Sequence, residues 1–440
     1  MSKLLIQGGR VIDPSQRMDR VTNVLVEDGR IAAFDVPRDA AARLVDASGK
    51  IVTPGLVDMH VHLREPGDEE DETIASGAAA ALAGGFTSVA CAADTDPPID
   101  SRAAVEFVRH QASLAGRANV LVVACVSKNR EGKELAEIGQ LVEAGAVAFS
   151  DNDAAIHDSE LMRRAFEYCL MFDKPLLSHA EVRELTQGGL MHEGLVSLVL
   201  GLPGMPAEAE DVMTSRDISL AEATGGRVHL LSVSSAGSLD MVRRAKTRGV
   251  RVTAGVAPHH FTLTDERLRT FNSNYKTNPP LRGQPHVEAC VAALADGTID
   301  VISSGHAPHS VEKKMRELSE APFGVVGLET TLALVITQLI SPGHLDWPAA
   351  VAKMTINPAR ILGIDKGTLA VGADADVTVI DPEARWTVDP ANFVSKSRNT
   401  PFAGMTLQGR ADTVILGGRV AEVARTDPQH SASAVEQGLV

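Results

Sequence analysis

Aromatic residues are scarce in this sequence: only 3% of its 440 residues are Phe, Trp or Tyr. Hydrophobic residues still make up 44% of the chain, which is enough to bury a sizeable core. That core must therefore be mainly aliphatic, built from Ala, Val, Leu and Ile. A chain of this length is too long for one small domain and suits a large α/β barrel with an additional domain.

Cysteines are also few, and the four of them, Cys91, Cys125, Cys169 and Cys290, lie far apart without a Cys-x-x-Cys pair. This spacing argues against structural disulfides and a thiolate metal site, and it fits a reducing compartment. The N-terminus lacks the apolar segment of a signal peptide. No apolar run approaches the roughly 18 residues that a membrane span requires. We therefore expect a cytoplasmic protein without a membrane segment.

Basic residues are outnumbered by acidic ones, and the formal net charge is −15. Nucleic-acid binding requires clustered Lys and Arg, so this balance argues against a nucleic-acid partner.

Strand-like and helical segments alternate through residues 55–365. Each apolar strand candidate is followed by a longer stretch rich in Ala and Leu. Eight such strands, joined by right-handed crossovers, predict a (β/α)8 TIM barrel. The strand candidates are residues 56–63, 86–92, 119–127, 146–152, 175–181, 228–234, 251–257 and 300–306.

The two ends of the chain have a different pattern, with short strands and Gly-rich turns in residues 1–54 and again in 366–425. Alternating apolar positions between such turns predict antiparallel sheet. We expect both segments to form one small β-sandwich satellite domain beside the barrel. The small and polar residues of 426–440 predict a disordered tail.

Metal-capable side chains lie where three of the predicted barrel strands end. His60 and His62 are two positions apart on the first strand, so both side chains point to the same face. Asp151 ends the fourth strand and His179 ends the fifth. Since the chemistry of such barrels takes place at the carboxyl ends of the strands, these four residues predict a metal site.

Several motifs resemble those of dihydroorotases of the long bacterial class, in the amidohydrolase superfamily. The likeness extends over nearly the whole chain, and REPG and NPPLR are its most specific parts. The motifs are DMHVHLREPG (58–67), GGFTSVAC (84–91), DTDPPID (94–100), AFSDN (148–152), SHAE (178–181), PHH (258–260), YKTNPPLR (275–282), GHAPH (305–309), Lys313-Lys314 and GLET (327–330).

The resemblance implies an activity, the zinc-dependent and reversible hydrolysis of L-dihydroorotate to N-carbamoyl-L-aspartate in pyrimidine (UMP) biosynthesis. In that family a metal-bridging hydroxide attacks the ring amide carbon, and an Asp at the end of the eighth strand carries the proton. The implied zinc ligands are His60, His62, Asp151 and His179.

Four further positions correspond to substrate-binding positions of the family: Arg64, Asp94, Asn278 and His309. The arginine would hold the substrate carboxylate by a bidentate fork. Asp94 departs from the family pattern, in which this position carries Asn. A carboxylate at that place would repel the carboxylate of the substrate.

Two other departures affect the metal site and the proton carrier. The sixth-strand motif has Ser232 where the family has a histidine ligand, and the eighth-strand motif has Gly305 where the family has the catalytic Asp. No catalytic residue is therefore intact. The remaining ligands support one zinc ion and make a second doubtful. Loss of the general base predicts a rate lower by roughly 10²–10⁴.

Three hypotheses follow from these residues. The first is an active dihydroorotase with an altered, single-zinc site. The second is an impaired or inactive dihydroorotase-like subunit that scaffolds aspartate transcarbamoylase, with which the family often assembles, and Ser232 and Gly305 favour it. The third is a hydrolase of another cyclic amide, for which Asp94 would fit a neutral or cationic substrate group. We also expect a homo-oligomer.

Overall fold

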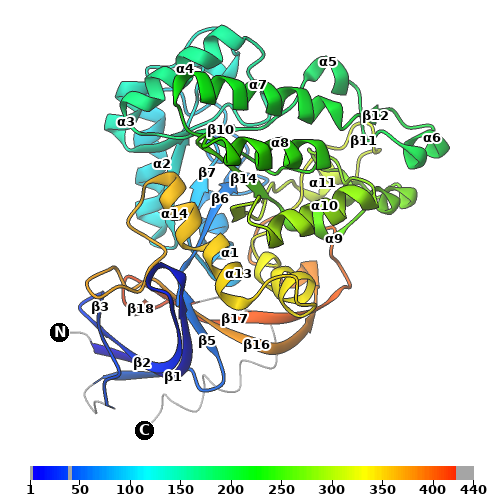
Figure 1. Cartoon of the computed structure of the whole chain (residues 1–440). Helices are drawn as coiled ribbons and strands as arrows, with labels where there is room; N and C mark the ends of the chain where they lie inside the picture. Colours follow the sequence, from blue (N-terminus) through cyan, green and yellow to red (C-terminus); the bar gives the residue numbers. More distant parts are fainter. Residues whose placement is uncertain (1–2, 38–41, 423–440) are drawn as a thin grey trace.

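The computed structural model describes residues 3–37 and 42–422, so the predicted tail at 426–440 lies outside the described residues. Its centre is a parallel eight-stranded barrel (Figure 1). All eight predicted strands are present, in the spatial order β15-β14-β13-β10-β9-β8-β7-β6. Their bounds are β6 Leu56–Val61, β7 Phe86–Cys91, β8 Asn119–Ala124, β9 Ala146–Phe149, β10 Leu176–Ser178, β13 Val228–Leu230, β14 Val252–Val256 and β15 Val301–Ile302.

The barrel closes where its first and last strands meet. Val61 on β6 forms a parallel bridge with His306, and the His62 N–H donates to the His306 carbonyl at 2.8 Å. The (β/α)8 barrel predicted from the sequence is therefore confirmed. Closure also brings the residues after β15 directly beside the His60-Val61-His62 segment.

Helices surround the barrel, so its strands are buried on both faces; every residue of β6 is buried. Strands enclosed in this way are apolar throughout instead of alternating. The covering helices are α1 Ile74–Gly84, α2 Arg102–Ala115, α3 Ile138–Ala144, α4 Ser159–Met171, α7 Glu208–Thr224, α8 Ala236–Thr247, α10 Gln284–Ala295, α12 Thr331–Val335, α13 Trp347–Met354 and α14 Ile356–Leu362.

Shorter elements lie in the loops after the strands. In Figure 1 the helix α6 projects to the right of the barrel on an arm that it shares with β11 and β12. These elements are α5 Arg183–Thr186, β11 Met191–His192, α6 Leu195–Leu200, β12 Gly204–Met205, α9 Pro258–Thr262 and α11 Val311–Lys314.

The pair Gly84-Gly85 shows how the sequence fixes local structure at the end of α1. Gly85 ends the helix with φ +93°, a conformation that glycine adopts without steric cost. At Gly84 a Cβ atom would lie 2.0 Å from the Leu328 carbonyl oxygen. A larger residue at position 84 would therefore push α1 away from the segment that follows β15.

Both chain ends build the satellite domain, which lies below the barrel in Figure 1. Its strands form one sheet in the order β18-β17-β16-β5-β1-β2-β3, with β4 paired to β1. The ends meet where β5 pairs with β16, for example Thr53 with Thr378. The bounds are β1 Lys3–Asp13, β2 Met18–Glu27, β3 Arg30–Phe34, β4 Arg43–Asp46, β5 Ile51–Pro54, β16 Val377–Thr387, β17 Thr406–Leu416 and β18 Arg419–Val420.

The apolar residues of this sheet pack in a cluster of their own, which includes Val11, Val24, Val52, Val377 and Ile415. The sheet therefore has its own small core beside the barrel. Among the described residues, no helix has the length and apolar character that crossing a bilayer would require.

Candidate active site

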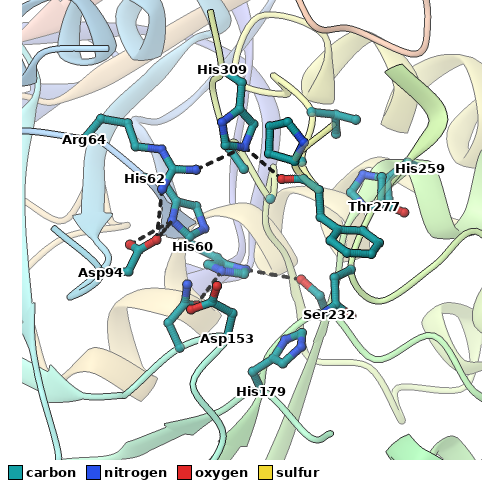
Figure 2. A pocket seen from close by; sticks show the side chains of 18 residues that line it. His60, His62, Arg64, Asp94, Asp153, His179, Ser232, His259, Thr277 and His309 are labelled. Atoms are coloured by element: carbon teal, nitrogen blue, oxygen red, sulfur yellow. Dashed lines mark hydrogen bonds and ion pairs between the residues drawn. The ribbon is translucent and has the colours of Figure 1, made fainter. Parts of the chain in front are cut away.

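A cavity of about 330 Å³ opens at the carboxyl ends of the barrel strands. Its walls combine residues at or just after the ends of the strands with residues of later loops, and Figure 2 shows their side chains around the cavity. They include His60 and His62 at the end of β6, His179 after β10 and Ser232 after β13. The chain therefore brings most of the predicted site residues into one place.

Both ring nitrogens of His60 have neutral partners inside this cavity. Nδ1 lies 3.2 Å from the Ser232 hydroxyl oxygen, and Nε2 lies 3.1 Å from Asn152 Oδ1. Burial, together with the neighbouring His62 and His179, lowers the pKa of His60 to about 3. The imidazole is therefore neutral, and it donates to the Asn152 oxygen while its other nitrogen accepts from Ser232.

His62 contacts a carboxylate instead. Its Nδ1 lies 2.7 Å from Asp94 Oδ2, and the same oxygen accepts from Arg64 Nη1 at 3.0 Å. Burial would raise the pKa of Asp94, but the charges of His62 and Arg64 outweigh it and hold that pKa well below its usual range. Asp94 is thus an ionised carboxylate between two nitrogen donors.

His179 forms a pair with Glu181, at 3.2 Å between Nε2 and Oε2. Burial opposes charge on both groups, yet their mutual attraction raises the pKa of His179 and lowers that of Glu181 to about 2. Asn278 donates to the same Glu181 oxygen at 2.8 Å. The predicted ligand His179 and the predicted substrate-binding residue Asn278 therefore share one carboxylate partner.

Asp151 is the one predicted ligand that does not line this cavity. Its carboxylate accepts from the backbone N–H groups of Val126 and Ser127, at 2.8 and 3.0 Å, and from the Ser127 hydroxyl. The cavity is lined instead by the next two residues, Asn152 and Asp153. The chain turns at Asn152, where φ is +51°, and this turn places the amide beside His60.

The position of the missing catalytic Asp lies in the cavity wall. Gly305 has φ +60°, and a Cβ atom there would lie 3.2 Å from the Ala257 Cβ and 3.3 Å from the His259 ring. Burial holds the pKa of His259 well below its usual value. On this side of the cavity the lining therefore consists of the neutral imidazole of His259 and the backbone of Gly305, with no carboxylate at position 305.

His309 and Arg64 meet at the far wall. His309 Nε2 lies 2.8 Å from the Phe323 carbonyl oxygen and 3.4 Å from Arg64 Nη2. The Asp71 carboxylate is 3.4 Å from the other ring nitrogen of His309. Three predicted substrate-binding residues, Arg64, Asp94 and His309, thus form one connected network.

Comparison with known proteins decides the family, because a model described as "Amidohydrolase family" matches residues 51–421. The chain belongs to this family. Among curated amidohydrolase relatives, a dihydroorotase from Pelotomaculum thermopropionicum is 54% identical over 419 residues, 95% of this chain and 98% of the relative. A dihydroorotase from Syntrophus aciditrophicus is 51% identical over 423 residues, 95% of this chain and 99% of the relative. The chain is an amidohydrolase of the dihydroorotase type.

Solved structures support the barrel with its satellite domain. An L-hydantoinase (dihydropyrimidinase) from Arthrobacter aurescens superimposes with a TM-score of 0.83 at 25% identity, over 96% of both chains. A D-hydantoinase (dihydropyrimidinase) from Thermus sp. gives a TM-score of 0.81 at 26% identity, over 95% of both chains. The architecture is thus that of cyclic amidohydrolases.

Amidohydrolases are generally metal-dependent, so the donors of this cavity must be compared with what a metal requires. Zinc and similar ions are held by imidazole, carboxylate and thiolate groups. Residues 3–37 and 42–422 contain no group of three or more His, Cys, Asp or Glu side chains arranged to hold a metal ion. The hydrogen-bond partners of His60 are an amide and a hydroxyl. These residues do not fit a two-metal centre.

The sequence motifs do not single out three residues that contribute to the site. Asn152 ends the AFSDN motif next to the predicted ligand Asp151, and it is the Asn152 side chain that reaches the cavity. Glu181 belongs to the SHAE motif, which was the available signal for its role. Phe323 lies in a segment without a motif, and it contributes its carbonyl oxygen to His309.

Proposed function

We propose that this dihydroorotase-type protein turns over L-dihydroorotate far more slowly than enzymes with a complete metal centre. The observation that carries the proposal is the surroundings of His60, whose two ring nitrogens are occupied by Ser232 and Asn152. An imidazole in such neutral hydrogen bonds is held in place without a metal. The family reaction, reversible hydrolysis of a cyclic amide, depends on the hydroxide that metal ions generate.

Metal binding in this proposal is limited to one weakly held zinc ion. Without Asp151 the available donors are His60, His62 and His179, and each of them is already hydrogen-bonded. A zinc ion would have to displace Asn152 from His60 and Glu181 from His179. None of these three donors is left over for a second zinc ion.

The proton carrier is the other missing part. Gly305 has no side chain, and Asp153, the other acidic residue of the cavity wall besides Asp94, is largely exposed and paired with Arg130. Loss of a general base lowers rates by about 10²–10⁴. We therefore expect turnover at least about a hundredfold below that of a relative with His and Asp at the positions of Ser232 and Gly305.

Steady-state kinetics tests this proposal. The purified protein is supplied with zinc and assayed for hydrolysis of L-dihydroorotate and for cyclisation of N-carbamoyl-L-aspartate. The comparator is a dihydroorotase that carries the His and the Asp. Rates similar to those of the comparator in either direction would contradict the proposal.

An assembly role is the second part of the proposed function. A chain that keeps the fold but not the metal centre serves as a cytoplasmic scaffold, and the partner that the family suggests is aspartate transcarbamoylase. We expect the two proteins, and several copies of this chain, to co-elute in size-exclusion chromatography when they are produced together. Separate elution of the transcarbamoylase at micromolar concentration would exclude it as the partner.

A further inference from the structure

All three guanidinium nitrogens of Arg64 contact groups of the protein. Its Nη1 donates to Asp94 at 3.0 Å and its Nε donates to the Pro308 carbonyl at 3.2 Å. Its Nη2 lies 3.4 Å from His309 Nε2. A guanidinium recognises a carboxylate through two parallel hydrogen bonds, and here Asp94 takes a hydrogen bond from Nη1 while Pro308 takes the one from Nε.

The charged residues of the cavity also disfavour a ligand carboxylate. Its described lining contains one arginine, no lysine, and the two aspartates Asp94 and Asp153. Arg64 is balanced by Asp94, and Asp153 is paired with Arg130. Buried charges of like sign repel each other strongly where the effective dielectric constant is low. A ligand carboxylate at Arg64 would therefore lie close to the Asp94 carboxylate and compete with it for the same guanidinium.

Asp94 is also fixed in position. Its side chain is only 8% exposed, and two residues further on the Asp96 N–H donates to the Pro66 carbonyl at 3.0 Å. At Gly67 a Cβ atom would lie 2.4 Å from the Asp96 carbonyl oxygen. The segment that carries Asp94 is therefore packed against the segment that follows Arg64, and the carboxylate itself is held by His62 and Arg64.

From this geometry we infer that Asp94 is a specificity-determining residue that closes the Arg64 site to ligand carboxylates. The cavity then selects uncharged cyclic amides over their carboxylated counterparts. This inference concerns ligand choice and does not rest on the loss of the metal centre. Its test is equilibrium binding, so it can fail while the proposed function stands, and the reverse is also true.

The experiment uses two ligands that differ only in one carboxylate, L-dihydroorotate and 5,6-dihydrouracil. Their affinities for the full-length protein are measured by isothermal titration calorimetry before and after Asp94→Asn. The asparagine keeps an oxygen acceptor for His62 and removes the charge that occupies Arg64. We expect the affinity for L-dihydroorotate to rise at least tenfold and that for dihydrouracil to change less than threefold.

Asp153→Asn is the matched control, because it removes one negative charge from the same cavity without touching Arg64. We expect it to change the affinity for L-dihydroorotate less than threefold. In the double variant Asp94→Asn with Arg64→Met, the affinity for L-dihydroorotate should fall back to the wild-type value. An unchanged affinity in Asp94→Asn, an equal gain in Asp153→Asn, or an equal gain for dihydrouracil would each overturn the inference.

Discussion

We propose that three residues separate this cavity from a metal centre, and these residues share one backbone feature. Asn152, Ser232 and Gly305 all have left-handed backbone conformations, with φ of +51°, +48° and +60°. Besides glycine, this region favours Asn, Asp and His. Asp and His side chains at these positions would therefore be compatible with the existing backbone. In the proposed function, the site thus differs from a metal centre in its side chains and not in the course of its backbone.

Asp151 has a structural role in this account, and its removal should show that role. In Asp151→Ala, the Val126 and Ser127 donors lose their acceptor inside the protein. We expect the free energy of unfolding to fall by about 1–3 kcal/mol, as for other buried donors left unpaired, while bound zinc stays unchanged. Thermal unfolding and elemental analysis measure the two quantities.

Asp153→Ala is the control, since the Asp153 side chain is 62% exposed and makes one surface ion pair. Its expected cost is below about 1 kcal/mol. A large loss of bound zinc in Asp151→Ala would show that this carboxylate is a ligand after all.

The sequence was sufficient to predict which strands carry the site, but not the direction of every side chain. His60 and His62 lie on a regular strand, so their common face follows from its twofold periodicity. Asp151 and Asn152 lie beyond the end of β9, where no periodicity applies. Which of the two enters the cavity depends on the turn at Asn152, and a single sequence does not specify that turn.

Among the elements, the loop after α11 closes one side of the cavity, and two lysines hold it. Lys276 Nζ donates to the carbonyls of Leu318 and Ala321, at 2.7 and 2.6 Å. Lys314 Nζ donates to the carbonyls of Pro322 and Gly324, at 2.9 and 3.1 Å. These bonds fix Phe323, whose carbonyl contacts His309.

Burial, with a smaller effect of the Lys276 charge, lowers the pKa of Lys314 to about 7. The unfolded chain then binds more protons than the folded one between about pH 7 and pH 10.5, so this group makes stability rise with pH in that window. Lys314→Met removes this dependence. We expect the melting temperature of the wild type to rise by a few degrees relative to that variant between pH 7 and pH 10.

Lys313→Met is the control, because the adjacent Lys313 has its pKa raised by Glu70, Asp71 and Asp68, which outweigh the effect of burial. The contribution of such a group is fully present below its unfolded pKa and is lost only at higher pH. The difference in melting temperature between Lys313→Met and the wild type should therefore stay constant between pH 7 and pH 10. If the difference in melting temperature between Lys314→Met and the wild type were also constant over this range, Lys314 would not have the lowered pKa that we assign to it.

For the whole molecule, one buried carboxylate links the barrel to the satellite sheet. Asp376 accepts from Asn119 at the start of β8, from the Gly417 N–H and from Lys366, at 3.0, 2.8 and 2.7 Å. The sequence predicted that both chain ends form one domain, since their strand patterns match. The contact of Asp376 with the barrel could not be predicted, because an Asp beside a Gly-rich turn has the same sequence pattern as a solvent-exposed residue.

Asp376→Asn should weaken this junction. Removing one partner of a buried ion pair costs about 3 kcal/mol. Asp374→Asn is the matched control, because Asp374 pairs with the same lysine at 3.0 Å but is 44% exposed, so its cost should stay below about 1 kcal/mol. Thermal unfolding of both variants measures the difference, and equal losses would mean that Asp376 does not stabilise the junction.

The account depends most on the claim that the side chains at positions 152, 232 and 305 removed the metal centre from an otherwise intact barrel. Zinc bound per chain at equilibrium, measured in the wild type and in the triple variant Asn152→Asp, Ser232→His and Gly305→Asp, tests it directly. We predict that after dialysis against micromolar zinc the wild type holds much less than one ion and the triple variant holds at least one. One or more tightly bound ions in the wild type would contradict the account.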